Sequence, residues 1–341
     1  MKIPVQFVPQ LKNIKLLPND VVIIDRRLLS FRQVKSWTAN SIKYPVVAGE
    51  SLKDIKKFPS HMEKILRLTN KISPKELRFV VIGGGSVGDF GGFIASVYKR
   101  GMPLINIPST WLAAVDSSHG GKTGLNAAGT KNQVGSFYPA KSVYVCKELL
   151  FLQPRERALD AYGEVVKAFL LDAKLSRTNF LSLAVSEETL WKFLKQCIEA
   201  KYRIVNRDPK EQSGIRSLLN LGHTVGHAFE VVLKWPHGKA ILYGLAFDLF
   251  WSEEQGLITS NDLKNIVNSK VWKELFHFQE YQKALSFPSK RIMKLIQQDK
   301  KKTTSKNIRQ VFVARAGKPL LETIPLQEIR TEYERQQKYF H

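Results

Sequence analysis

The sequence predicts an α/β fold in two parts, an N-terminal, doubly wound parallel sheet followed by a mostly α-helical C-terminal part. Up to about residue 150, short β-rich runs alternate with amphipathic helical patterns, which is typical of parallel sheets. One β-rich run leads directly into a glycine-rich turn and a helical pattern. From Pro154 onward the pattern is mostly helical. We therefore expect two domains, residues 1–150 and residues 151–341.

The individual elements follow from residue type and periodicity. The strands expected in the first domain are Val21–Asp25, Pro45–Ala48, Leu77–Ile82, Leu104–Ile107 and Ser142–Cys146, with an amphipathic helix over Leu52–Ile72. The helices expected in the second domain are Pro154–Asp172, Glu187–Asn206, Arg216–Lys234, Gly238–Gln255 and Lys290–Asp299. Two late β-like runs, Gln310–Arg315 and Leu320–Thr323, predict a small hairpin.

The composition is that of an ordinary globular protein. The chain has 341 residues, of which 43% are hydrophobic and 24% are charged, enough for two domains with sizeable cores. No apolar run is long enough to span a bilayer, and the N-terminus lacks the apolar core of a signal peptide. Only two cysteines are present, Cys146 and Cys197, which fits a reducing compartment. We expect a soluble cytoplasmic protein with no membrane partner.

The net charge of +23 favours anionic partners, either a small phosphorylated molecule or a nucleic-acid backbone. The densest basic segment is Lys290–Arg309. A solvated helix face explains most such runs, and the chain has no zinc finger, RNP motif or basic zipper. We therefore expect no specific binding of nucleic acid.

The glycine-rich turn lies in LRFVVIGGGSVGDF, where Gly83, Gly85 and Gly88 match the pattern G-x-G-x-x-G. Glycines permit close backbone approach, and the amino end of the following helix favours a pyrophosphate. The strand and helix on either side favour nucleotide binding in a Rossmann-like sheet. Asp89 directly after the turn would accept a hydrogen bond from a ribose or an amide, or else cap the helix.

A second glycine-rich region, IPSTWLAAVDSSHGGKTGLNAAGTKN, contains Asp116, Lys122, Lys131 and Asn132. Lysines in such a region suit phosphate or carboxylate binding, as point charges on flexible stems. The alternative is a surface loop with incidental lysines.

A stripe of polar residues in RSLLNLGHTVGH is the most informative feature of the second domain. Arg216, Asn220, His223 and His227 lie at offsets 0, 4, 7 and 11, which places them on a stripe roughly 60° wide if the segment is a single helix. The rest of the segment is apolar, so these groups need polar partners unless the stripe faces bulk water.

The histidines of that stripe are candidate metal ligands. In GEVVK, Glu164 and Lys167 are three residues apart, on one face of a helix, where a surface ion pair is the common interpretation. If Glu164 instead meets His223, a second histidine would complete the three-ligand set of a catalytic zinc. That histidine could be His237 or His227, and spacing alone does not choose between them.

Taken together, these segments resemble 3-dehydroquinate synthase, the cyclising enzyme of the shikimate pathway. The resemblance rests on GGGSVGD, IPSTWLAAVDSSHGGKTGLN, GTKN, GEVVK, RSLLNLGHTVGHAFE, a later HG and QQDKK, in the order and spacing of the family. It extends from about residue 45 to residue 301.

The resemblance implies NAD, a divalent metal ion and residues for both. The metal ion would be zinc, with cobalt as the alternative, and its ligands would be Glu164, His223 and His237. The residues implied in NAD binding are Glu50, Lys53, Gly85, Ser86, Val87, Gly88, Asp89, Ser109, Thr110, Lys122 and Lys131.

The implied substrate is 3-deoxy-D-arabino-heptulosonate 7-phosphate, an anionic sugar phosphate. The residues at substrate-site positions are Asp116, Lys122, Asn132, Lys167, Lys201, Arg216, Asn220, His227, Lys300 and Lys301. Arg100 matches an arginine that the family donates across a dimer interface, which implies a homodimer. The implied reaction eliminates phosphate after a transient oxidation by NAD+, so no net redox change occurs.

Three positions depart from the family pattern. Ala48 replaces a usual acidic residue, Phe151 lies in an altered segment, and Lys239 stands where a glutamate is normal. We expect altered cofactor contacts or altered geometry around the metal ligands. Rival interpretations are another sugar phosphate cyclase, whose substrate lacks the carboxylate that Arg216 suits, and a metal-dependent alcohol or glycerol dehydrogenase.

Overall fold

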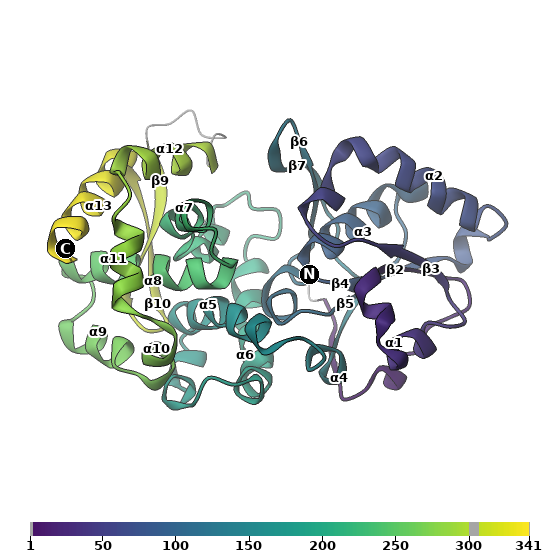
Figure 1. The fold of residues 1–341 in the computed structure, drawn as a ribbon, viewed down its shortest axis with the longest axis horizontal. Helices are drawn as coiled ribbons and strands as arrows, with labels where there is room; N and C mark the ends of the chain where they lie inside the picture. The colour runs from purple at the N-terminus through teal and green to yellow at the C-terminus, as the bar shows by residue number, and fades with distance from the viewer. Residues whose placement is uncertain (1–2, 300–306, 341) are drawn as a thin grey trace. The chain divides into compact units, whose positions relative to one another are not determined.

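A computed structural model describes residues 3–299 and 307–340, so Lys300 and Lys301 lie outside the described residues. The chain divides into two compact units, Met1–Arg157 and Ala158–His341 (Figure 1). Each unit has its own buried core. Within the described residues, no helix combines the length and the apolar composition needed to cross a membrane.

The first unit is built on a six-stranded parallel sheet in the order β1-β8-β5-β4-β2-β3. Its strands are β1 (Val5–Val8), β2 (Asp20–Asp25), β3 (Ile42–Val46), β4 (Arg78–Gly83), β5 (Leu104–Pro108) and β8 (Ser142–Cys146). Its helices are α1 (Arg32–Trp37), α2 (Phe58–Thr69), α3 (Gly85–Val97) and α4 (Lys147–Leu150). The central strands β2 and β4 are almost entirely buried and therefore consist of continuous apolar runs.

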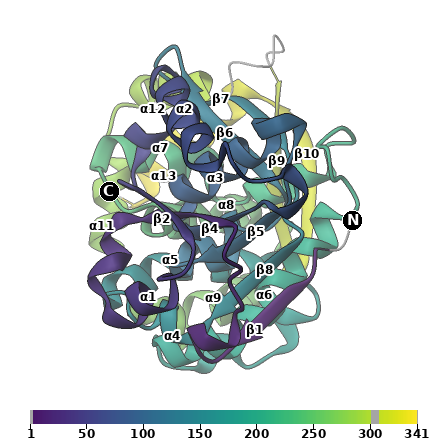
Figure 2. The same cartoon turned by 90° about the vertical axis from the view of Figure 1, so that its right-hand side faces the viewer.

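Helices cover both faces of this sheet (Figure 2). On one face, Val22 and Val80 belong to an apolar cluster that includes residues of α1 and α4. On the other face, α3 packs so closely on β4 that a Cβ at Gly91 would lie 2.5 Å from a methyl group of Val81. The predicted doubly wound, parallel sheet is confirmed.

The sequence pattern placed most strands of this unit correctly but missed others. The strand expected at residues 45–48 is displaced toward the C-terminus, because β3 spans Ile42–Val46. The edge strand β1 and the antiparallel hairpin β6 (Lys122–Ala127) and β7 (Thr130–Phe137) were not predicted. The hairpin is rich in glycine and exposed polar residues, so it has no apolar alternation to detect.

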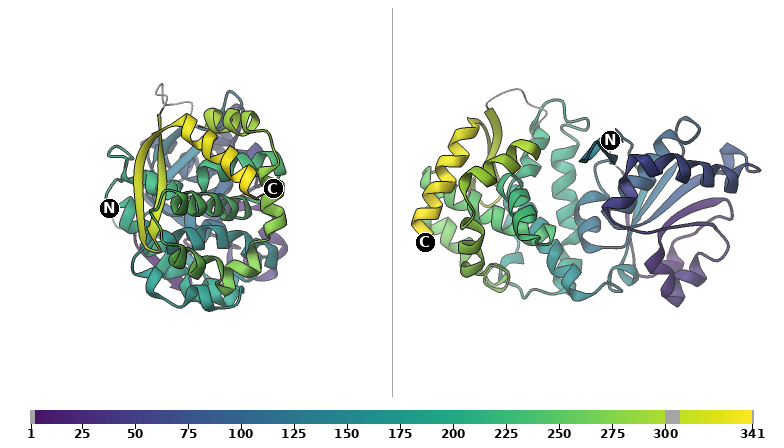
Figure 3. Two further views of the ribbon diagram at one scale, coloured as in Figure 1. Left: turned by 90° about the vertical axis from the view of Figure 1, so that its left-hand side faces the viewer. Right: turned by 45° about the horizontal axis from the view of Figure 1, so that its top comes forward.

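The second unit is mostly helical. Its longer elements are α5 (Arg155–Leu171), α6 (Glu187–Val205), α7 (His223–Leu233), α8 (His237–Glu254), α9 (Ser260–Val267), α10 (Lys270–Leu275), α11 (Phe278–Leu285), α12 (Ser289–Asp299) and α13 (Leu326–Phe340). Helix α8 is buried on nearly all sides and forms the centre of the unit. The hairpin β9 (Asn307–Arg315) and β10 (Lys318–Pro325), which is confirmed, lies beside α8 (Figure 3).

Candidate functional site

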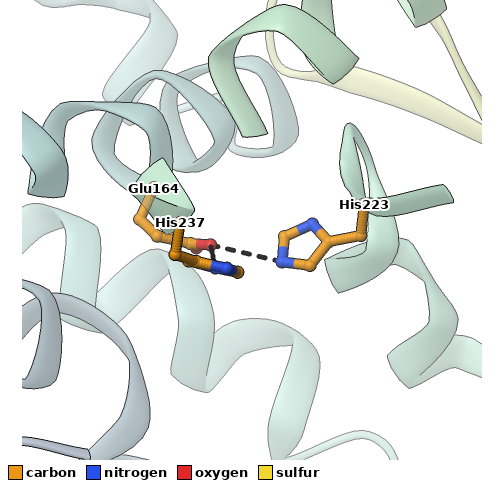
Figure 4. A group of neighbouring side chains, drawn as sticks. All are labelled: Glu164, His223 and His237. Atoms are coloured by element: carbon orange, nitrogen blue, oxygen red, sulfur yellow. Dashed lines mark hydrogen bonds and ion pairs between the residues drawn. The ribbon is translucent and has the colours of Figure 1, made fainter. Parts of the chain in front are cut away.

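Three side chains from separate elements of the second unit converge on one point (Figure 4). Glu164 comes from the middle of α5, His223 is the first residue of α7, and His237 is the first residue of α8. Glu164 Oε1 lies 3.3 Å from His223 Nε2 and 3.3 Å from His237 Nε2. The Glu164 side chain is only 2% exposed. The structure thus brings together the three residues that the resemblance implied as metal ligands.

Close packing between α5 and α8 places Glu164 beside His237. A Cβ at Gly163 would lie 2.0 Å from the carbonyl oxygen of Gly238, and a Cβ at Gly238 would lie 1.4 Å from that of Asp160. In addition, Asp160 Oδ1 accepts a hydrogen bond of 2.6 Å from the Gly238 N–H at the start of α8. Neither position tolerates a side chain, so glycines adjacent to two candidate ligands determine their separation.

A glycine turn also places His223. Gly222 has a left-handed φ of +77°, and a Cβ at Gly244 of α8 would lie 1.9 Å from the Gly222 carbonyl oxygen. The Gly222 N–H donates to Asp248 Oδ2 at 2.7 Å, and Gln310 Nε2 donates to Asp248 Oδ1 at 2.8 Å. Asp248 therefore anchors the turn before His223. Sequence reasoning missed Asp248 because nothing in its local pattern marks it.

The predicted single helix over residues 216–234 is wrong. Arg216 and Asn220 lie in a short 3-10 helix, Ile215–Asn220, and Leu221 (φ −52°, ψ 128°) leaves the helical conformation before Gly222. The polar stripe is therefore divided between two elements. The physical reason is the left-handed glycine, which packs against α8 and stops one helix before the next begins.

The convergent ligand atoms have the spacing that a tetrahedral divalent ion requires. Two ligands bound at about 2.1 Å in tetrahedral geometry lie roughly 3.4 Å apart, close to the 3.3 Å of both glutamate–histidine pairs. Glu164 Oε2 forms an ion pair with Lys167 Nζ, so Oε1 faces the histidines. One carboxylate with two imidazoles is typical of catalytic zinc, with the fourth position for water or substrate. The residues present fit a divalent ion.

Two of the three groups, Glu164 and His223, are already in the protonation state that a cation requires. Burial alone would raise the pKa of Glu164, but Lys167 and the two histidines outweigh it and hold the pKa well below its usual value. Burial, with help from Lys167, lowers the pKa of His223 to about 4. Burial also acts to lower the pKa of His237, but the carboxylates of Glu164 and Glu230 outweigh it and raise that pKa.

Sequence reasoning also missed Glu230. This residue lies seven positions after His223 in RSLLNLGHTVGHAFE, on the same face of α7 as His223 and His227. Glu230, His227 and His237 form a second group whose candidate ligand atoms all lie within 4.8 Å of one another. Continuing the helical periodicity past His227 would have found Glu230.

Arg216 is held by a carboxylate that the sequence did not reveal. Asp208 is buried, and its two oxygens accept backbone hydrogen bonds from Gln212, Ser213, Gly214 and Arg216 at 2.7–3.3 Å. The Arg216 guanidinium donates to the Pro209 carbonyl at 3.1 Å. The loop between α6 and the 3-10 helix is therefore organised around Asp208, with Arg216 at its end.

The glycine-rich turn of the first unit joins β4 to α3, as predicted. Gly84 is the N-cap residue of α3, so Asp89 lies inside the helix and the interpretation of Asp89 as a helix cap is wrong. A Cβ at Gly83 would lie 2.5 Å from Val87, and one at Gly85 would lie 3.2 Å from Ser117 Oγ. Glycine thus keeps the amino end of α3 approachable, where a helix favours phosphate groups.

Lys53 connects three elements of the first unit. It is 3% exposed, and its Nζ donates to Asp89 Oδ2 at 2.6 Å and to Asn132 Oδ1 at 2.5 Å. Asn126 adds to this network, since its Oδ1 accepts from the Asn132 N–H at 2.9 Å and its Nδ2 donates to Glu50 Oε2 at 2.8 Å. Burial raises the pKa of Asp89 against the opposing effect of Lys53. Asn126 was not predicted.

The remaining predicted residues of the first unit lie around the same turn or on the β6–β7 hairpin. Ser109 donates its N–H to the Gly83 carbonyl at 2.9 Å, and Thr110 Oγ1 accepts from the Ala113 N–H at 3.2 Å. Asp116 lies in a π-helical turn, Ala113–Ser117, a feature common at functional sites. Lys122 and Lys131 are exposed on the hairpin, and Arg100 is exposed in the segment after α3. In the second unit, Lys201 is partly buried on α6, and Asn220 is exposed.

The three positions that depart from the family pattern lie in different local environments. The Lys239 ammonium lies 2.5 Å from Glu280 Oε1 and 4.8 Å from the ring centroid of Trp235, so a carboxylate partly neutralises its charge. Phe151 packs edge-on against Trp111. Nothing in the structure assigns a role to Ala48.

Comparison with solved structures identifies the fold. The fold is similar to 2-deoxy-scyllo-inosose synthase complexed with carbaglucose-6-phosphate, NAD+ and Co2+, with a TM-score of 0.81 at 22% identity over 97% of this chain and 96% of that chain. It is also similar to 2-epi-5-epi-valiolone synthase from Streptomyces hygroscopicus subsp. jinggangensis 5008 with NAD+ and Zn2+ bound, with a TM-score of 0.81 at 18% identity over 99% and 98% of the two chains. The chain therefore shares the fold of these two synthases.

Sequence comparison gives the family. The family models for the 3-dehydroquinate synthase N-terminal and C-terminal regions match residues 43–160 and 161–302. The 3-dehydroquinate synthase of Parabacteroides distasonis is 36% identical over 256 residues, which cover 72% of this chain and 69% of that protein. The chain belongs to the 3-dehydroquinate synthase family.

Proposed function

We propose that the protein converts 3-deoxy-D-arabino-heptulosonate 7-phosphate to 3-dehydroquinate and phosphate. The observation that carries the proposal is the convergence of Glu164, His223 and His237 at 3.3 Å spacings, in a chain of this family. Such an enzyme is a carbon–oxygen lyase that forms a ring, and its place is the shikimate pathway of aromatic amino-acid biosynthesis.

The metal ligands in this proposal are Glu164, His223 and His237. A bound zinc or cobalt ion supplies Lewis acidity, which lowers the pKa of a substrate hydroxyl. Lys167 holds the second carboxylate oxygen of Glu164, so that Glu164 offers a single oxygen to the ion. His227, on the same face of α7 as His223, would contact substrate or move a proton in this proposal.

The first unit binds NAD in this proposal, through the amino end of α3 and the surrounding predicted residues. NAD supplies a temporary hydride acceptor that ends the reaction unchanged. The positive end of α3 favours the pyrophosphate, and glycines permit its approach. The network of Lys53, Asp89 and Asn132 holds polar groups in place beside this helix.

The substrate carries a carboxylate and a phosphate, and the proposed contacts are largely cationic or amide groups. Arg216 suits the planar carboxylate, and Asp208 fixes its backbone. The further proposed contacts are Asp116, Lys122, Asn132, Lys167, Lys201, Asn220 and His227, and Lys300 and Lys301 outside the described residues.

A phosphate-release assay tests this function. With the heptulosonate phosphate, NAD and zinc, inorganic phosphate should appear without net absorbance from NADH. A chelator should stop the release, and added zinc or cobalt should restore it. Stoichiometric NADH would instead indicate a dehydrogenase and contradict the proposal.

The homodimer and the cytoplasmic location remain predictions. Arg100, which would reach the partner's substrate site, is exposed and has a left-handed φ of 70°. Such a backbone conformation is unusual for arginine and is often retained for function. Sedimentation velocity gives the oligomeric state. If the protein sediments as a monomer at assay concentrations while fully active, the role of Arg100 is wrong.

A further inference from the structure

His237 has a polar partner on each side of its ring. Its Nε2 lies 3.3 Å from Glu164 Oε1, and its Nδ1 lies 3.0 Å from Glu230 Oε2. Glu230 comes from the last turns of α7, and its side chain is 27% exposed. The imidazole is therefore held between a buried carboxylate and a half-exposed one.

The chemistry of a carboxylate decides which ring nitrogen carries a proton. An ionised carboxylate only accepts hydrogen bonds, so Nδ1 donates to Glu230. When Nε2 gives up its own proton to bind an ion, the proton on Nδ1 stays with Glu230 and the lone pair lies on Nε2. That lone pair is directed toward the point where Glu164 Oε1 and His223 Nε2 already converge.

Two candidate metal groups share His237, and the geometry favours one of them. The group of Glu164, His223 and His237 has a fully buried carboxylate and two 3.3 Å spacings. In the group of His227, Glu230 and His237, the contact between Glu230 and His237 is an ordinary hydrogen bond of 3.0 Å. Glu230 therefore acts on His237 from the side away from Glu164.

We propose that Glu230 is a positioning residue, whose carboxylate holds the Nδ1–H of His237 so that Nε2 is presented to the ion bound by Glu164 and His223. The inference rests on the proposed function only through the divalent ion. The local charge also favours a divalent cation. Two carboxylates, of Glu164 and Glu230, and one ammonium, of Lys167, give a net charge of −1 around the two imidazoles. Carboxylates that orient metal-binding histidines typically contribute about 10- to 100-fold in metal affinity.

Metal affinity of the full chain, measured without NAD or substrate, tests this proposal. Zn2+ and Co2+ dissociation constants are determined by chelator competition for the wild type, Glu230→Ala and Glu230→Gln. Glu230→Ala should weaken binding about 10- to 100-fold. Glu230→Gln should weaken it less, because its amide oxygen can still accept the Nδ1–H. Glu199→Ala is the matched control, since Glu199 is exposed in the middle of α6, and its affinity should equal that of the wild type.

Further measurements separate the alternatives. Circular dichroism establishes that each variant is folded, and the Co2+ absorption spectrum of Glu230→Gln should keep its tetrahedral bands. A folded Glu230→Ala protein that binds zinc as tightly as the wild type would overturn the positioning role alone. His223→Ala, which removes a proposed ligand, serves as the reference for ligand loss. If Glu230→Gln lost as much zinc affinity as His223→Ala, Glu230 would be a ligand, and the positioning role would again be overturned. A wild-type protein that binds neither ion would overturn both this inference and the metal part of the proposed function.

Discussion

At the residue scale, Asp208 links backbone structure to the proposed carboxylate contact of Arg216. Burial alone would raise the pKa of Asp208, but the backbone N–H donors of Ser213, Arg216 and Gln212 outweigh it and lower the pKa to about 2. Because the pKa is depressed in the fold, ionised Asp208 stabilises the protein above the unfolded value of about 3.9. This stability is lost as the pH falls toward 2.

We expect Asp208→Asn to disturb Arg216, because an amide NH2 group would replace one acceptor and face backbone donors. Misplacement of this kind can lower kcat/KM by up to about 100-fold. Steady-state kinetics measures the effect, and Glu199→Gln is the control. The stability difference between Asp208→Asn and wild type should shrink as the pH falls from about 4 to about 2. A constant difference over that range would contradict the account.

The raised pKa of His237 predicts that metal binding releases a proton. Without metal, Glu164 and Glu230 keep His237 protonated at neutral pH, whereas a ligand imidazole must give up its Nε2 proton. His223, with a pKa of about 4, is already neutral there. Metal affinity should therefore fall about tenfold for each unit by which the pH drops near neutrality. Calorimetry in buffers of different ionisation enthalpy counts the protons, and a count of zero at pH 7 would refute the prediction.

At the element scale, glycine contacts between helices set the positions of the candidate ligands. The polar stripe in RSLLNLGHTVGH includes a residue of each candidate metal group. Its assignment to one helix was wrong because Gly222 ends the 3-10 segment. Local periodicity has no information about the Gly222–Gly244 contact, which joins segments 22 residues apart. The roles of Gly163 and Gly238 likewise depend on the contact between α5 and α8, which the local sequence does not encode.

Gly238→Ala tests this packing. Its added Cβ would lie 1.4 Å from the Asp160 carbonyl, so the start of α8 must move and carry His237 away from Glu164. A displacement of the ligand should weaken zinc binding by at least about 10-fold. Gly88→Ala is the control, because Gly88 is also helical and its Cβ would come no closer than 4.0 Å to a neighbour. Equal zinc affinity in both variants would show that the contact does not position His237.

At the scale of the whole molecule, each unit contains its own candidate binding elements. Glu164, His223 and His237 all belong to the second unit, whereas the glycine-rich turn, Lys53 and its partners belong to the first. Each ligand should therefore stabilise the unit that holds it. By linkage, an ion at a thousand times its dissociation constant adds about 4 kcal/mol to the free energy of unfolding of its unit.

Removal of zinc by a chelator should consequently destabilise the second unit more than the first. Hydrogen exchange should speed up in α5, in the start of α7 and in the start of α8, while β2 and β4 keep their protection. Addition of NAD should instead slow hydrogen exchange in the first unit more than in the second. Equal loss of protection in both units on chelation would mean that the units unfold together and that this prediction is wrong.

The sequence by itself determined the alternation of strands and helices, the glycine-rich turn after β4 and the three candidate metal ligands that the structure brings together. These features depend on periodicity and residue type, which act within a few residues. Tertiary structure decided which residues meet: His237 with Glu164, Asp208 with the Arg216 backbone, and Glu230 with His237. It also decided where the helix before His223 ends. Such pairings depend on close backbone contacts between distant segments, and the free energy of these contacts overrides local helical preference.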